Sequence, residues 1–337
     1  MKKHWMVIIV SIVLLLGILA GLSWYVSKDE NKEDEAAKQP PLKQAYSVTG
    51  EGQTAYVTYD EEGNNEIHLS NPGSNQKSTV LSVDEPVVSI DFSADGETLY
   101  YATNDIISNR TLLSHIYSYH LETKKETELL QSSSIVMEVK AGSTDDSLLY
   151  YRANAFEDMG GITGKVRSDF QAYRLDLSDL SEEQLTSLDD KEIKGLAYTK
   201  EEDGALVSVG NTIIKIPFEN PEDTETILTE TEQVYDLAVN RQDGGIIYSM
   251  PGKDGPGTYK YELYYRDSEG EKTQITENES HTGNPALLPN GDLYYMIDAN
   301  FGKGEPSYVL YKQSPWKEGE PEVVDLPDDK LNQDDES

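Results

Sequence analysis

The sequence of 337 residues predicts an all-β protein made of six successive units, each with four short strands. Three observations support this prediction. Apolar and polar residues alternate with a period of two over most of the chain from residue 42 onward. A pair of such runs, separated by a tight turn, returns roughly every 40 to 57 residues. After Ser27 no segment shows the apolar spacing that is typical of an amphipathic helix.

The repeated pair is clearest at residues 89–101, where two alternating runs flank the dipeptide Asp95-Gly96. Gly, Asn and Asp accept the positive φ angles that tight hairpins require, so this segment predicts a hairpin. Four further units carry a similar dipeptide between their first two strands: Asp145-Asp146, Asp203-Gly204, Asp243-Gly244 and Asn290-Gly291. The first two strands of each unit are therefore expected to pair with each other.

Two more runs follow in every unit. The third strands are expected at 66–69, 115–121, 171–177, 212–216, 261–265 and 308–311. The fourth are expected at 79–83, 127–130, 183–186, 226–229, 273–276 and 322–326. Because a four-stranded sheet cannot bury both of its faces alone, these repeats predict a six-bladed β-propeller. A solenoid of β-units is the alternative, although its repeats are usually shorter.

Several segments resemble the TolB-type, WD40-like propeller repeat of bacterial proteins. They are residues 91–100 and 115–121 in the second unit, 261–276 in the fifth and 288–295 in the sixth. The resemblance is faint in the first and fourth units, and Ala94 stands where the repeat usually has proline. It implies a fold that periplasmic binding proteins share with the propeller domains of larger peptidases. The resemblance therefore implies an architecture and no catalytic role.

An uncharged apolar run extends from Trp5 to Ser27, about 23 residues, which is long enough to span the hydrocarbon layer of a membrane. Trp5 and the pair Trp24-Tyr25 stand where an interfacial aromatic belt would lie, and two lysines precede the run. We therefore expect a single-pass anchor in the cell membrane, with a cytoplasmic N-terminus and an extracellular propeller. A cleaved signal peptide is the alternative, because Ala20 and Ser23 leave cleavage open.

These features divide the chain into four parts. Residues 1–27 are the cytoplasmic stub and transmembrane signal-anchor, and 28–41 form a charged, proline-containing linker. Residues 42–327 form the propeller, and 328–337 form an acidic, disordered tail.

The composition excludes several function classes. The formal net charge of -34 argues against nucleic acid as a partner and against attraction to an anionic membrane surface. The chain has no cysteine, which excludes disulfides, thiolate metal sites, cysteine nucleophiles and a lipoprotein anchor.

Long connections between the second and third strands are expected on one face of the propeller, at 104–114, 154–170, 251–260 and 298–307. Uneven loop length on one face is typical of a binding surface. Aromatic and cationic residues gather in these connections and are the candidate ligand-binding residues: Arg110, Phe156, Lys165, Arg167, Phe170, Lys253, Phe301 and Lys303. Such residues in an acidic protein suit an anionic or peptide-like partner. Alternatively, the phenylalanines pack beneath their own loops and the cations offset local acid.

The longest connection, 156–170, is expected to cover one mouth of the central channel, and its glycines Gly160, Gly161 and Gly164 would let it move. A phosphate-binding loop is excluded, because the required glycine-to-lysine spacing is missing.

Metal sites are weakly indicated. His115 and His120 lie five apart on one strand, which places them on opposite faces, and His281 reads as a surface turn residue. Residues 298–305 have spaced oxygen ligands but lack the closing glutamate of a calcium loop, so calcium is the one cofactor left open.

The sequence thus predicts a membrane-tethered, extracytoplasmic module that binds a protein, peptide or cell-envelope ligand through the long-loop face. No catalytic residue is assigned. The alternative is a hydrolase or lactonase-like propeller enzyme with a divalent metal at the channel mouth. A purely structural scaffold is the third interpretation.

Overall fold

The structure is a computed structural model that describes residues 39–327, except 61–62, 74–77, 109–110, 145, 159–164, 189–190, 253–259, 303 and 317–318. Over these residues it contains 24 strands and no helix, which confirms the predicted all-β fold. The expected anchor, most of the expected linker and the expected acidic tail lie outside the described residues. In the part that is described, no helix is long and apolar enough to cross a membrane.

The strands form four four-stranded sheets and one eight-stranded sheet. Units 1 to 3 contain β1 (Tyr46–Val48), β2 (Thr54–Tyr59), β3 (Asn65–Ser70), β4 (Ser78–Val83); β5 (Val87–Phe92), β6 (Thr98–Ser108), β7 (Thr111–His120), β8 (Lys125–Ser132); and β9 (Ile135–Ala141), β10 (Ser147–Asp158), β11 (Lys165–Asp176), β12 (Glu182–Gln184). Units 4 to 6 contain β13 (Ile193–Tyr198), β14 (Gly204–Val209), β15 (Thr212–Pro217), β16 (Glu225–Thr229); β17 (Tyr235–Val239), β18 (Ile246–Pro251), β19 (Tyr261–Arg266), β20 (Lys272–Gln274); and β21 (His281–Leu287), β22 (Leu293–Asp298), β23 (Tyr308–Gln313), β24 (Glu322–Val323).

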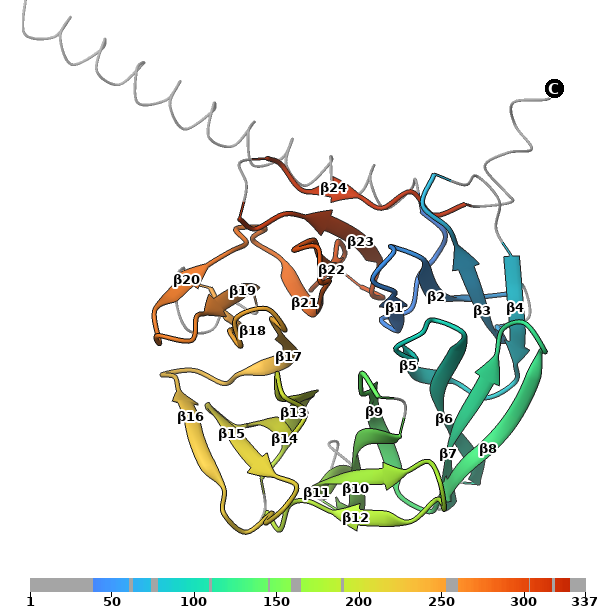
Figure 1. Ribbon diagram of the computed structural model, residues 1–337. Coiled ribbons are helices and arrows are strands. Elements are labelled where there is room, and N and C mark those ends of the chain that lie inside the picture. Colours follow the sequence, from blue (N-terminus) through green and yellow to red (C-terminus); the bar gives the residue numbers. More distant parts are fainter. Residues whose placement is uncertain are drawn as a thin grey trace, which may run out of the picture.

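The units are arranged around a common centre. Figure 1 shows the first strand of each unit (β1, β5, β9, β13, β17 and β21) nearest the middle of the ring. Units 5 and 6 make up the eight-stranded sheet and are joined at a parallel pair, Tyr261 and His281. This arrangement of antiparallel sheets is that of a β-propeller, as the repeats predict.

The hydrophobic core is divided among the junctions between neighbouring units. One buried cluster lies at each junction, and the cluster between units 6 and 1 joins Tyr46 and Tyr56 to Leu288, Met296 and Leu310. Five units place a fully buried tyrosine in the second strand: Tyr56, Tyr101, Tyr150, Tyr248 and Tyr295. Each sheet therefore gains its apolar contacts from its neighbours, which explains why a single unit would not fold alone.

Three of the five predicted tight turns follow the predicted chemistry, and the turn at Asp145-Asp146 lies partly outside the described residues. Gly96, Gly244 and Gly291 have φ angles of 73°, 84° and 87°, the left-handed region that glycine tolerates. In unit 4 the left-handed residue is Glu202, with φ of 55°, and not Gly204, which begins β14.

Two of the four predicted long loops are wrong. β6 and β7 stay paired as far as Ser108 and Thr111, and β10 and β11 as far as Asp158 and Lys165. The connections expected at 104–114 and 154–170 are thus mostly extended hairpins.

The two ends of the described chain meet between units 6 and 1. Leu42 forms an isolated antiparallel bridge with Tyr308, and the hydroxyl of Tyr56 donates to the carbonyl of Pro327 over 3.3 Å. Leu326 is buried in the same cluster as Leu42. Residues from both ends therefore complete the ring.

Candidate functional site

The centre of the ring contains two cavities on opposite faces. The larger, about 790 Å³, is lined by inner strands and by connections between second and third strands, including Tyr59, Glu305 and Pro306. We call this side the loop face. The smaller, about 350 Å³, is lined by the tight turns of the opposite turn face, including Ala94 and Pro289. The larger volume falls in the range of ligand-binding cavities.

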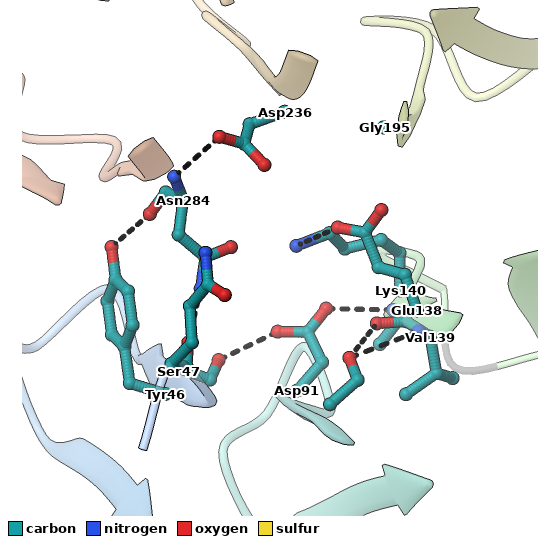
Figure 2. A network of polar contacts seen from close by, with 12 residues as sticks. Tyr46, Ser47, Asp91, Glu138, Val139, Lys140, Gly195, Asp236 and Asn284 are labelled. Carbon is teal, nitrogen blue, oxygen red and sulfur yellow. Dashed lines mark hydrogen bonds and ion pairs between the residues drawn. The ribbon is translucent and has the colours of Figure 1, made fainter. Parts of the chain in front are cut away.

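A belt of polar residues from the inner strands separates the two cavities (Figure 2). Asp91 of β5 is its first connection. Its Oδ1 accepts a hydrogen bond of 2.7 Å from the hydroxyl of Ser47 on β1, and its Oδ2 accepts one of 2.9 Å from the backbone N–H of Ala141 on β9. This one carboxylate therefore joins units 1, 2 and 3.

Glu138 and Lys140 of β9 form an ion pair in the belt, with Nζ and Oε1 3.1 Å apart. Burial raises the pKa of Glu138, and Lys140 only partly offsets this effect. Burial alone would lower the pKa of Lys140, but the carboxylates of Glu138 and Asp91 hold it above its ordinary value. Each member of the pair therefore offsets the cost of burying the other's charge.

Asp236 connects units 5 and 6. Its Oδ2 accepts hydrogen bonds of 3.0 Å from the hydroxyl of Ser249 and from the backbone N–H of Asn284. It lies at a β-bulge of β17 with φ of 43°, which aims its carboxylate at the channel. A Cβ on Gly195 would lie 2.9 Å from the Asp236 backbone, and one on Gly283 would lie 2.5 Å from its Oδ2. Both glycines make room for Asp236.

Asn284 closes the belt between units 6 and 1. Its carbonyl accepts a hydrogen bond of 2.6 Å from the hydroxyl of Tyr46, and its side-chain amide donates to the carbonyl of Gln44 over 2.5 Å. The hydrogen bonds of the belt therefore join the inner strands of units 1, 2 and 3 and those of units 5, 6 and 1. The carboxylates of the belt already have partners within the protein, and the belt lies at the inner end of the loop-face cavity.

Aromatic and basic side chains line the mouth of the loop-face cavity. Tyr59 is 49% exposed, and the ammonium of Lys43 lies 4.3 Å from the centre of its ring. Lys194 of β13 pairs with Glu192 and lies 5.8 Å from the ring centre of Tyr235. Aromatic faces next to cations are typical of surfaces that bind partners.

An aromatic row continues from this mouth over units 5 and 6. Tyr235 and Tyr261 meet edge-to-face at 5.1 Å, Tyr261 and His281 at 4.9 Å, and His281 stacks on Phe301 at 5.0 Å. The prediction that His281 is a surface turn residue is wrong: it begins β21, and burial lowers its pKa. The bulge between Gly283 and Ala286 admits Pro285 into this strand, which hid the start of the strand, residues 281–284, in the sequence.

The structure describes the side chains of two of the candidate ligand-binding residues. Phe301 is half-buried on the loop face against His281. Phe170 is 5% exposed and packs in the core between units 3 and 4. The six others lie outside the residues whose side chains are described: Arg110, Phe156, Lys165, Arg167, Lys253 and Lys303. Along the backbone, Phe156 is paired with Arg167. The binding role of all eight stays a prediction.

The histidines and the expected calcium segment have structural partners. His68 lies 2.7 Å from the hydroxyl of Thr58, and His115 lies 3.0 Å from a carboxylate oxygen of Glu128. Asp298 accepts hydrogen bonds from the backbone N–H groups of Asn300 and Ser307. Among the described residues no three His, Asp or Glu side chains form a group that could hold a metal.

The sequence interpretation missed the belt and Lys43. Asp91, Glu138 and Asp236 lie on the first strand of their units, where charged residues interrupt apolar runs. In a propeller the first strand is innermost, so charges on it could have indicated the channel. From the sequence, Lys43 is placed in the propeller but in no binding site. Its partners, Tyr59 of β2 and Asn65 of β3, are brought to it only by the folded structure.

No protein-family model matches the sequence, and no curated protein matches it. Among solved structures, the chain is similar to TolB from Acinetobacter baumannii, with 16% identity and a TM-score of 0.57. The fold is that of the TolB-type propellers. The match covers 77% of this chain and 60% of that TolB chain, so this chain spans less than two thirds of its relative.

Two further propellers support the same fold. A putative TolB from Agrobacterium tumefaciens has 10% identity and a TM-score of 0.55, over 77% of this chain and 87% of that chain. The WD40 propeller domain of Doa1 has 15% identity and a TM-score of 0.54, over 86% of this chain and 84% of that chain. At these identities the similarity concerns the fold alone.

Proposed function

We propose that this protein is a six-bladed propeller, tethered to the membrane by residues 1–27, that binds a protein, peptide or cell-envelope ligand at its loop face. One observation carries the proposal. The loop-face cavity of about 790 Å³ ends on a polar belt whose groups are bonded to one another, while its mouth carries Tyr59 and Lys43. A cavity of this size below exposed aromatic and basic side chains favours binding.

The row of aromatic side chains over units 5 and 6 also favours the loop face as the binding surface. The row from Tyr235 to Phe301 lies on the side that carries the β22–β23 connection, and Phe301 belongs to that connection. On the turn face the cavity is smaller, and the two aromatic residues that line it, Phe92 and Tyr198, are buried in the core. Aromatic side chains supply large contact areas at low entropic cost, which suits a binding surface.

The membrane tether follows from the apolar run at 5–27 and the charged segment after it. In this proposal the tether holds the propeller outside the cell, where a ligand of the cell envelope would reach it. Protease treatment of intact cells tests the topology: removal of the propeller, with protection of an N-terminal tag inside, is the expected result. Survival of the propeller in intact cells with loss on lysis would contradict it.

The assignment of binding to the loop face can be tested by blocking that face with a bulky label. The chain has no native cysteine, so one engineered cysteine can be labelled selectively with a bulky maleimide. We expect labelling of Tyr59→Cys to prevent recovery of the partner from membranes. Labelling of Lys125→Cys, at the start of β8 next to the β7–β8 turn, should leave recovery unchanged. The opposite pattern would show that the turn face is the binding surface.

A further inference from the structure

Lys43 differs from the other lysines of the loop-face cavity. Lys140 is paired with Glu138, and Lys194 is paired with Glu192. Among the described residues, no carboxylate lies within ion-pair distance of Lys43, although acidic residues outnumber basic ones by 62 to 28 in the chain. Within the described part of the chain, Lys43 is thus a cation that has no carboxylate partner.

The position of Lys43 is held firmly. Its ammonium donates to Oδ1 of Asn65, and the same oxygen accepts a hydrogen bond of 3.2 Å from the backbone N–H of Val87. Its own backbone N–H donates to the carbonyl of Val57 over 2.8 Å. The side chain is half-buried, and this burial lowers its pKa. An anion that came to the ammonium would therefore meet a pre-positioned, partly dehydrated charge.

A second unpaired charge lies at the same cavity. Glu305 is exposed, lines the cavity beside Pro306 and Tyr308, and makes no ion pair with any basic residue in the described part of the chain. Tyr59 and Tyr308 add aromatic surface next to Lys43. Over the residues that the structure describes, the cavity thus offers one cation and one anion that have no ion-pair partner, together with aromatic side chains.

We propose that Lys43 binds the C-terminal carboxylate of a neutral or basic peptide, with Tyr59 as the adjoining apolar surface. This inference rests on the proposed function and specifies its ligand. The net charge of -34 repels polyanions, so a ligand with a single carboxylate is favoured. Glu305 would accept a basic group of the same peptide.

A peptide fits this cavity better than an acidic polysaccharide. The walls of the cavity are formed by the ends of inner strands, including residues 43–46 and 86–90. A peptide that ends in one carboxylate and carries one basic group would match the single charges of Lys43 and Glu305, and its side chains could pack on Tyr59 and Tyr308. A polysaccharide of uronic acids would instead bring many carboxylates to a strongly acidic protein.

The experiment uses the full-length chain, purified in detergent, on an array of hexapeptides immobilised through their N-termini. Each peptide is present twice, with a free C-terminal carboxylate and with a C-terminal amide. A third set carries an acidic side chain together with the amide, and polygalacturonate is spotted as a polysaccharide probe. We expect a subset of neutral or basic peptides to bind about tenfold or more weakly when amidated.

Two variants test the assignment to Lys43. Lys43→Gln should bind the free carboxylates as weakly as the amides, whereas Lys125→Gln, which removes an equal charge on the turn face, should bind like the wild type. Tyr59→Ala changes an exposed side chain and should weaken the same peptides while the protein unfolds at the wild-type temperature.

Each other outcome overturns the inference. The inference is wrong if free acids and amides bind equally, or if no peptide binds at all. It is also wrong if Lys43-dependent binding is seen only with the acidic side-chain set or only with polygalacturonate. The proposed function has its own readout. If the label on Tyr59→Cys blocks the partner while no dependence on a free carboxylate is found, the face is correct and the ligand chemistry is wrong.

Discussion

The side-chain amide of Gln39 is hydrogen-bonded to the backbone of Leu310, 271 residues further along the chain. The amide nitrogen donates to the carbonyl of Leu310 over 3.2 Å, and the amide oxygen accepts from its N–H over 2.9 Å. The same nitrogen donates to the carbonyl of Val324 over 2.5 Å. Gln39 therefore acts as a clasp between the start of the described chain and its last unit.

The clasp predicts that Gln39→Ala destabilises the propeller. The substitution leaves buried backbone groups of Leu310 and Val324 without these bonds, and each such loss costs about 1–3 kcal/mol. Urea unfolding measures the change. Gln53→Ala, which removes an exposed bond to Asn71, is the control and should change stability by less than about 0.5 kcal/mol. Equal stability of both variants would contradict the clasp.

The space around Asp236 predicts that neither neighbouring glycine can carry a methyl group. Gly195→Ala and Gly283→Ala should each destabilise the protein by about 1–3 kcal/mol, because the new Cβ would overlap Asp236. Thermal unfolding measures both. Gly319→Ala is the matched control, since a Cβ at this position would have no atom within 4 Å, and it should unfold like the wild type. Tolerance at 283 would mean that Asp236 is not held in place.

The ion pair of Glu138 and Lys140 predicts that replacing Lys140 lowers the stability of the fold by an amount that depends on pH. Lys140→Met leaves the shielded carboxylate of Glu138 without its cation and should destabilise the protein by about 1–3 kcal/mol at pH 7. A raised pKa means that folded Glu138 holds its proton more tightly than the unfolded chain does. Stability is therefore lost as the pH rises from the ordinary pKa through the raised one, and the variant increases this loss.

The penalty of Lys140→Met should consequently shrink as the pH falls towards 4, where Glu138 becomes protonated. Unfolding in urea at several pH values from 4 to 8 measures this trend. Lys215→Met removes an exposed pair with Asp203 and should cost less than about 1 kcal/mol at pH 7. A penalty for Lys140→Met that stays constant over this range would contradict the shielded pair.

Removal of divalent metal is expected to leave the fold unchanged. Asp298, the first residue of the segment with spaced oxygens, already accepts two backbone N–H groups from its own loop. Thermal unfolding of the purified protein with and without a chelator should give the same midpoint. A stoichiometric divalent ion that is lost, together with stability or an activity, on chelation would favour the metal-dependent enzyme instead.

The strand order could be predicted because half-buried strands carry their period in the sequence, and turns such as Asp95-Gly96 have their own chemistry. The belt could not be predicted. The bulges at Asp236 and Gly283 depend on contacts between units, and they interrupt the alternation of apolar and polar residues locally. The same holds for Lys43, whose surroundings are supplied by Tyr59 and Asn65. Local pattern thus gives the elements, while the channel is a property of the assembled ring.

The most direct test of the loop face as the binding surface is photo-cross-linking on the membrane. A photoreactive amino acid replaces Tyr59 at the loop-face mouth, or Trp316, which is 45% exposed and packs on Tyr265 by the β23–β24 turn. We expect a discrete cross-linked product from position 59, lost when unlabelled protein is added in excess, and none from 316. A specific product from position 316 alone would contradict binding at the loop face.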